Sequence, residues 1–177
     1  LPFGTPVLQS GSAVNGAFPV ASLSPGSLIT VYGADLALET RAANFAPLVS
    51  NLGGAEILLN GQPIPIVFAS PGQVNAQIPP AFSPGAAKLR ARVDGKQSAE
   101  IDVQIAPAAP GIFVYGNNRA VAQNQDGAIN GEASGESPGR FAVLYLTGIG
   151  ATDNPVSPGA LSPSSPLARA LNPVELR

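Results

Sequence analysis

The chain has 177 residues, of which 45% are hydrophobic and 11% are charged, and its formal net charge is −2 at pH 7. This apolar content is enough for a buried core, and the scattered charges form neither a basic face for nucleic acid nor a Lys/Arg cluster for a membrane surface. Because the chain has no Cys and no His, it has no disulfide, no thiolate nucleophile and no imidazole to act as a general base or zinc ligand.

The 20 glycines and 19 prolines are typical of many short strands joined by turns, so we expect an all-β fold. The first clear strand signal is Leu28–Tyr32, a β-branched and aromatic run that follows Pro25-Gly26. Further along, Ala55–Leu59 and residues 64–68 flank Asn60-Gly61, which is the strongest short hairpin signal.

The neighbouring segments are predicted to be an edge strand, a short extended segment and a short helix. Pro63 and Pro65 cannot donate backbone hydrogen bonds, so the strand that contains them is predicted at a sheet edge. Residues 73–78 form another short extended segment. Residues 36–45, with Asp35 as an N-cap, are the one helix candidate and extend over a turn or two at most.

The last hairpin of the first half alternates charged and apolar residues around Asp94-Gly95. A three-residue loop over 94–96 places Leu89 against Ile101 on the inner face, whereas a two-residue turn would set Leu89 opposite an acidic residue. We therefore predict the three-residue loop. The expected details are Gly95 or Lys96 at positive φ, Arg90 opposite Glu100, and Lys88 opposite Asp102.

The second half of the chain repeats the first. Val7-Leu8-Gln9 is echoed by Val121-Ala122-Gln123, and Ser24-Pro25-Gly26 by Ser137-Pro138-Gly139, each time followed by an apolar run. We predict two tandem immunoglobulin-like β-sandwich units, the first over residues 1–106 and the second over 107–177. Residues 152–166, which have the composition of a linker, align as an enlarged loop inside the second unit.

The second unit has no counterpart of residues 59–106, so we expect it to be incomplete, to end in mid-strand, and to need strands from further chain or from another molecule. Residues 1–12 are the candidate exchanged strand. The expected acceptor is the open sheet that contains residues 141–146 and 174–176.

Two further segments carry a family resemblance. Residues 13–18 with 24–33 resemble the opening of bacterial IPT/TIG-type immunoglobulin-like domains. Residues 68–79, followed by Pro107-Ala108-Ala109-Pro110, resemble the Solibacter-type C-terminal module of large secreted proteins of Acidobacteria. This resemblance implies an extracellular β-sandwich with no catalytic residues to transfer, and the second unit departs from it by being short.

Three groups of polar residues imitate functional sites. Residues 124–132 match part of a calcium loop, but the aligned first ligand position is Ala122, so two turns are the simpler interpretation. The acidic residues could include a glycosidase pair, yet most fall on hairpins and solvent faces. Tyr32, Tyr115 and Tyr145 could stack on a sugar, although Tyr32 and Tyr145 end equivalent strands and are expected to anchor the sandwich.

We expect no catalytic, cofactor-binding or metal-binding residues, no cofactor and no nucleic-acid partner. We also expect no membrane insertion, because no run of about 18 apolar residues exists. Leu1 is interpreted as a processed end after removal of a signal peptide, which predicts an extracellular or cell-surface protein. The expected function is non-catalytic: structural or adhesive self-assembly into a filament by strand complementation. The alternative is a carbohydrate-binding or spacer module of a larger secreted protein, with cell-surface polysaccharide as a further partner.

Overall fold

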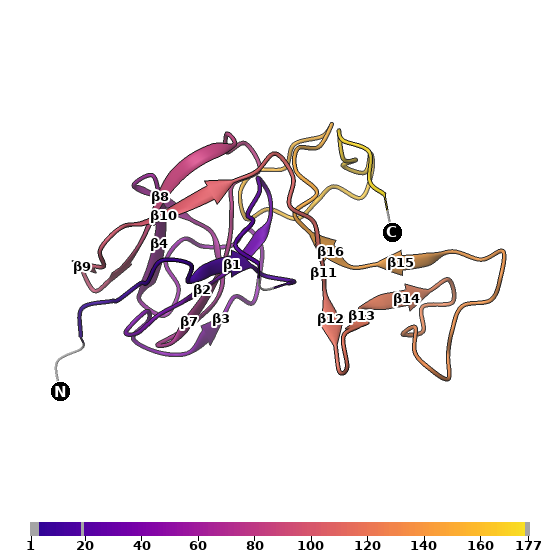
Figure 1. Cartoon of the computed structure of the whole chain (residues 1–177), viewed down its shortest axis with the longest axis horizontal. Coiled ribbons are helices and arrows are strands. Elements are labelled where there is room, and N and C mark those ends of the chain that lie inside the picture. Colours follow the sequence, from indigo (N-terminus) through magenta and orange to yellow (C-terminus); the bar gives the residue numbers. More distant parts are fainter. Residues whose placement is uncertain (1–3, 19, 176–177) are drawn as a thin grey trace.

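The computed structural model describes residues 4–18 and 20–175, and within them the chain consists of strands, turns and loops without a helix. The predicted all-β class is therefore confirmed. Figure 1 shows two parts side by side along the longest axis, with strands β1 to β10 in the first unit and β11 to β16 in the second.

The first unit consists of two antiparallel sheets. The strands of one sheet, in spatial order, are β1 (Ala13–Asn15), β2 (Leu28–Tyr32), β7 (Gln73–Gln77), β6 (Ile66–Ser70) and β3 (Arg41–Ala42). Those of the other are β10 (Ile101–Ile105), β8 (Gly85–Val93), β4 (Ala55–Leu59) and β5 (Gln62–Ile64), with β9 (Lys96–Gln97) paired to β8.

One apolar core lies between these sheets. Because successive side chains of a strand point to opposite faces, every second residue of β8 is buried, and Leu89 is fully buried between Leu59 of β4 and Ile101 of β10. Ile29 and Val31 of β2 supply the facing layer and are also fully buried.

The hairpin predicted at Asn60-Gly61 is confirmed. Leu59 pairs with Gln62, so the loop has two residues, and both adopt positive φ, with 49° at Asn60 and 79° at Gly61. Strand β5 is the last strand of its sheet, so Pro63 lies at an edge as predicted. The predicted strand over residues 64–68 is wrong in its extent, because the chain leaves this sheet at Pro65 and Ile66–Ser70 form β6 between β7 and β3 of the other sheet.

The helix predicted over residues 36–45 is wrong. Asp35 adopts a φ of 54°, which is not an N-cap conformation, and Arg41–Ala42 form β3 at the edge of the first sheet, paired with Phe68 and Ala69 of β6. Pairing with a neighbouring strand therefore overrides a weak local helix signal.

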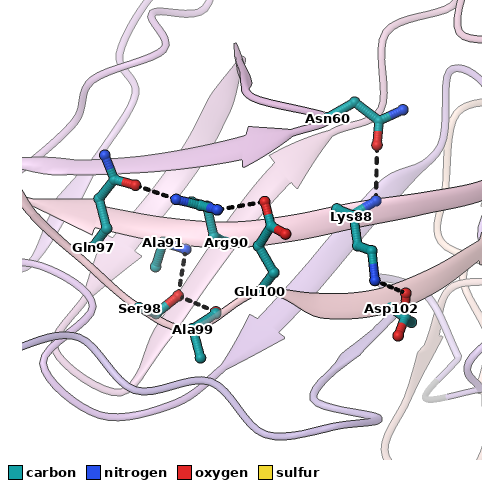
Figure 2. A network of polar contacts seen from close by, with 9 residues as sticks. All are labelled: Asn60, Lys88, Arg90, Ala91, Gln97, Ser98, Ala99, Glu100 and Asp102. Carbon is teal, nitrogen blue, oxygen red and sulfur yellow. Dashed lines mark hydrogen bonds and ion pairs between the residues drawn. The ribbon is translucent and has the colours of Figure 1, made fainter.

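The charged hairpin is partly as predicted (Figure 2). Lys88 pairs with Asp102, and their side chains form an ion pair at 2.6 Å, while Arg90 forms an ion pair with Glu100. The hydrogen bond to Asp102, together with its charge, raises the pKa of Lys88 above its usual value. The stabilisation from this pair is thus complete below the unfolded-state pKa and is lost as the pH rises through the folded-state pKa.

The predicted three-residue loop is wrong. Val93 pairs with Lys96, so Asp94 and Gly95 form a two-residue turn, with φ of 48° and 77°. The expected register of the outer strand is restored by a bulge, in which Ala99 and Glu100 together lie opposite one residue of β8.

Ser98 holds this bulge in place. It is 6% exposed, and its Oγ accepts a hydrogen bond from Ala91 N–H (3.0 Å) and donates one to the carbonyl of Ala99 (2.8 Å), as Figure 2 shows. We predict that Ser98→Ala lowers the free energy of unfolding by about 1–3 kcal/mol, because a buried N–H of β8 loses its acceptor. Urea denaturation measures this, and Ser98→Thr, which keeps the hydroxyl, should lose less; equal losses would contradict the role of the hydroxyl.

The second unit forms short two-stranded ribbons. The pairs are β11 (Gly111–Ile112) with β16 (Leu146–Thr147), β12 (Val114–Tyr115) with β13 (Arg119–Ala120), and β14 (Ala122–Asn124) with β15 (Ala142–Leu144). Within residues 107–175, the only buried hydrophobic side chains are those of Ala109 and Ala122. This part therefore has no apolar core of its own among the residues described.

The internal repeat survives in a turn but not in strand pairing. Ser27 N–H donates to Ser24 O, and Arg140 N–H donates to Ser137 O in the matching turn. In the first unit β1 lies beside β2, whereas in the second unit β14 takes the place beside β15 and Ile129 bridges the far side of β14. Residues 152–166 lie in a loop, and a bridge between Thr152 and Ala170 joins the start of this loop to the segment that follows it.

Candidate functional site

A largely exposed apolar stripe lies along β15 and the residues directly before and after this strand. Phe141, Val143 and Tyr145 alternate along the chain, so they lie on one face, and they are 60%, 44% and 45% exposed. Contiguous exposed apolar side chains on a strand mark a surface for interaction rather than for solvent. We call these three residues the apolar stripe.

One edge of the chain through β15 and β16 is unpaired. Tyr145 N–H donates to Val121 O (3.0 Å), and its carbonyl accepts from Phe113 N–H (3.0 Å), so β14 and β11 lie on the same side. Because backbone groups of successive strand residues alternate between the two edges, those of Leu144 and Leu146 point the opposite way. Among the described residues no strand pairs there, and Figure 1 shows β14 on one side of β15 only. We call this the open edge.

A hollow of about 610 Å³ lies beside the open edge. Gln77 and Pro80 of the first unit line one side, Leu144 and Leu146 line another, and Val174 lies on the C-terminal loop that closes it. Of the expected acceptor, residues 141–146 with 174–176, Leu144, Tyr145, Leu146 and Val174 line this hollow, and residues 176–177 lie outside the described range.

The hollow keeps its shape because the two units are joined by hydrogen bonds. Asn15 Nδ2 donates to Ala109 O (2.9 Å), Leu28 N–H donates to Thr147 Oγ1 (2.8 Å), and Gly159 N–H donates to Gln77 Oε1 (2.7 Å). Each bond joins a first-unit residue to a residue of the second unit, so the ribbons and the loop dock on the first sandwich.

Asn15 is the most deeply buried polar side chain of this junction, at 2% exposed. Its Oδ1 also accepts a hydrogen bond from Ala17 N–H (2.9 Å). We predict that Asn15→Ala lowers the free energy of unfolding by about 1–3 kcal/mol, because the carbonyl of buried Ala109 and the N–H of Ala17 lose their partner. Thermal denaturation checks this, with Asn130→Ala, a half-buried asparagine outside the junction, as the control; an equal effect of both would count against a special role of the junction.

The calcium-like segment 124–132 forms turns. Asp126 Oδ1 accepts from Ala128 N–H (2.9 Å), and Asn124 Oδ1 accepts from Asn130 Nδ2 (2.7 Å). These oxygens therefore bond within the loop. Across the described residues, no group of three or more His, Cys, Asp or Glu side chains could hold a metal ion.

The three tyrosines lie on the surface, which makes the expected role of Tyr32 and Tyr145 as sandwich anchors wrong. Tyr32, Tyr115 and Tyr145 are 47%, 41% and 45% exposed. Tyr145 OH donates to Gln123 Oε1 (3.1 Å), and Tyr115 OH donates to Asn130 O (3.0 Å). Tyr32 and Tyr115 lie on β2 and β12, and Tyr145 lies between β15 and β16.

The candidate exchanged segment, residues 1–12, packs on its own unit where the structure describes it. Val7 N–H donates to Ala34 O (2.9 Å), Ala34 N–H donates to Val7 O (3.1 Å), and Leu8 is 7% exposed in the core. Residues 1–3 lie outside the described residues.

No family model and no curated protein matches this chain. Among solved structures, the chain is similar to an auxiliary nutrient binding protein from Bacteroides ovatus, with 14% sequence identity and a TM-score of 0.33. The similarity covers 62% of this chain and 26% of that one. In the described residues, no helix is long and apolar enough to cross a membrane.

Proposed function

We propose that this is a secreted, non-catalytic structural or adhesive protein that self-assembles by β-strand complementation. The observation that carries the proposal is the second unit, where an apolar stripe lies beside an open edge. An unpaired edge flanked by exposed apolar side chains is a template for one more strand, and main-chain hydrogen bonds supply much of the affinity in such additions.

Several sequence features support the rest of the proposal. The absence of Cys and His from the sequence removes the thiolate nucleophile and the commonest general base. The low charge and the resemblance to IPT/TIG-type modules favour an extracellular or cell-surface protein with a second copy of itself as partner.

Sedimentation velocity and electron microscopy over a range of protein concentrations test self-assembly. We expect filaments for the native chain, none for Val143→Lys, which charges the apolar stripe, and normal filaments for Val114→Lys. Val114 is comparably exposed (40%) but lies on β12, away from the stripe. A native protein that stays monomeric at every concentration would contradict the proposal.

A second candidate is a carbohydrate-binding module or a spacer within a larger secreted protein. It is favoured by the exposed ring of Tyr145, which lines the hollow, because aromatic rings with a polar end bind sugars through stacking and hydrogen bonds. Calorimetric titration with cell-surface polysaccharides, comparing the native chain with Tyr145→Ala and Tyr32→Ala, would favour this candidate if only Tyr145→Ala abolished a measured affinity.

A further inference from the structure

The first unit has a strand at the position that corresponds to the open edge of the second unit. Strand β2 is the repeat counterpart of the chain through β15, and its neighbours are β1 on one side and β7 on the other. Tyr32 N–H donates to Ser12 O and Gly16 N–H donates to Leu28 O, so the backbone groups of Ile29 and Val31 face β7.

The second unit repeats this alternation without the second neighbour. Ala142 and Leu144 hold the places of Ile29 and Val31, and their backbone groups point to the open edge in the same way. In the first unit, Val31 pairs with Val74 of β7. The position equivalent to β7 is therefore the vacant one, and it fits a single antiparallel strand.

We propose that residues 5–9 of a second copy of this chain occupy that position, antiparallel to β15, with Val7 opposite Leu144. This rests on the proposed function and names its donor, its acceptor and their register. In this register Thr5 lies opposite Leu146, and Gln9 lies opposite Ala142.

The register follows from the proline of the donor segment. Pro6 has no N–H, so it must face away from the acceptor edge, which leaves Thr5, Val7 and Gln9 to make the hydrogen bonds. The same alternation is present where the segment lies now, because Val7 uses both its N–H and its carbonyl to bind Ala34.

In this register the donor strand also covers the apolar stripe. With Val7 opposite Leu144, Leu8 lies opposite Val143, and Pro6 lies opposite Tyr145, on the exposed face of β15. Both stripe residues are more than two-fifths exposed without such a strand, at 44% and 45%. Apolar cross-strand pairs are the contacts that stabilise an added strand beyond its backbone bonds.

The donor must come from another molecule. In Figure 1 the segment after the N-terminus and the strand β15 lie toward opposite ends of the longest axis of the chain. Because donor and acceptor are different surfaces, the contact is heterologous, and its repetition produces an open filament where the rotation between neighbours does not close into a ring. In its own unit the donor is attached by the bridge between Val7 and Ala34 and by the burial of Pro6 and Leu8, so donation to another molecule requires both buried side chains to leave this unit.

Engineered cysteines test the register directly, since the chain has none of its own. In Leu8→Cys/Val143→Cys, the two positions form a non-hydrogen-bonded pair, whose closely spaced Cβ atoms suit a disulfide. Oxidation of the assembled protein should produce a ladder of covalent polymers on a non-reducing gel, reversed by reductant. Because Leu8 lies in the core, Val7→Cys/Leu144→Cys at an exposed position serves as a second variant with the same expected ladder.

Leu8→Cys/Phe141→Cys is the matched control, because it moves the acceptor two residues along the same face, out of reach of a disulfide, and it should give no ladder. Equal ladders for control and test pairs would overturn the register. Filaments that form but yield no ladder in either test pair would overturn the donor and acceptor while leaving self-assembly intact. A protein that neither assembles nor cross-links would overturn both this inference and the proposed function.

Discussion

Leu89→Ala is expected to lower the free energy of unfolding of the first unit by about 2–5 kcal/mol, the range found for large-to-small changes in packed cores. Leu89 is fully buried on β8, between Leu59 on one side and Ile101 on the other. Replacing its isopropyl group by hydrogen leaves a cavity at the centre of the second sheet, where two neighbouring strands limit relaxation.

The neighbouring residue on β8 is the matched control. Arg90 points to solvent and forms an ion pair with Glu100, so Arg90→Ala should cost less than about 1 kcal/mol. Urea denaturation followed by circular dichroism compares the two variants. If Arg90→Ala were as destabilising as Leu89→Ala, the assignment of inner and outer faces to this sheet would be wrong.

Gly148→Ala is expected to detach the ribbons of the second unit from the first. Gly148 has a φ of 86°, and a Cβ there would lie 2.1 Å from the carbonyl oxygen of Ala109. The positive φ alone costs an alanine about 1–3 kcal/mol. The contact with backbone cannot be relieved by a side-chain rotation, so the segment must move and the junction at Asn15 and Thr147 should open.

Hydrogen exchange and limited proteolysis measure this effect, with faster exchange and cleavage expected over residues 107–150 while β8 stays protected. Gly139→Ala is the control, because Gly139 has a similar φ of 84° but nothing within 4 Å of the added Cβ. It separates backbone strain from the clash. Equal loosening by both variants would show that Ala109 does not constrain Gly148.

The low stability expected for the ribbons of the second unit links their ordering to assembly. Its ribbons have exposed apolar side chains and short strands, and a two-stranded ribbon is only marginally stable in water. An added strand would lengthen the β14–β15 ribbon and cover the apolar stripe, so assembly and ordering of this unit are expected to occur together.

The turn and strand positions were predictable because they depend on local chemistry. Asn60-Gly61 tolerates positive φ at both residues, Pro63 cannot sit inside a sheet, and Leu28–Tyr32 is rich in β-branched residues. The pairing of Lys88 with Asp102 was also predictable, because the period of two in a strand fixes which residues share a face.

Other predictions failed where the local conformation depends on contacts with residues far away in the sequence. Residues 36–45 have a weak helix pattern, but Arg41–Ala42 join the edge of a sheet through β6. The hairpin has a two-residue Asp94-Gly95 turn, and the bulge at Ala99 and Glu100, held by the buried hydroxyl of Ser98, shifts the pairing by one residue.

The all-β class, the strands Leu28–Tyr32, Ala55–Leu59 and Gln73–Gln77, and the edge position of Pro63 follow from the residues themselves. The neighbours of β14 and β15, the exposure of Tyr145, and the hollow lined by both units become visible only in the folded chain. The physical reason is that turns and side-chain alternation depend on adjacent residues. Which strand lies beside which depends on hydrogen bonds and burial between residues that are far apart in the chain.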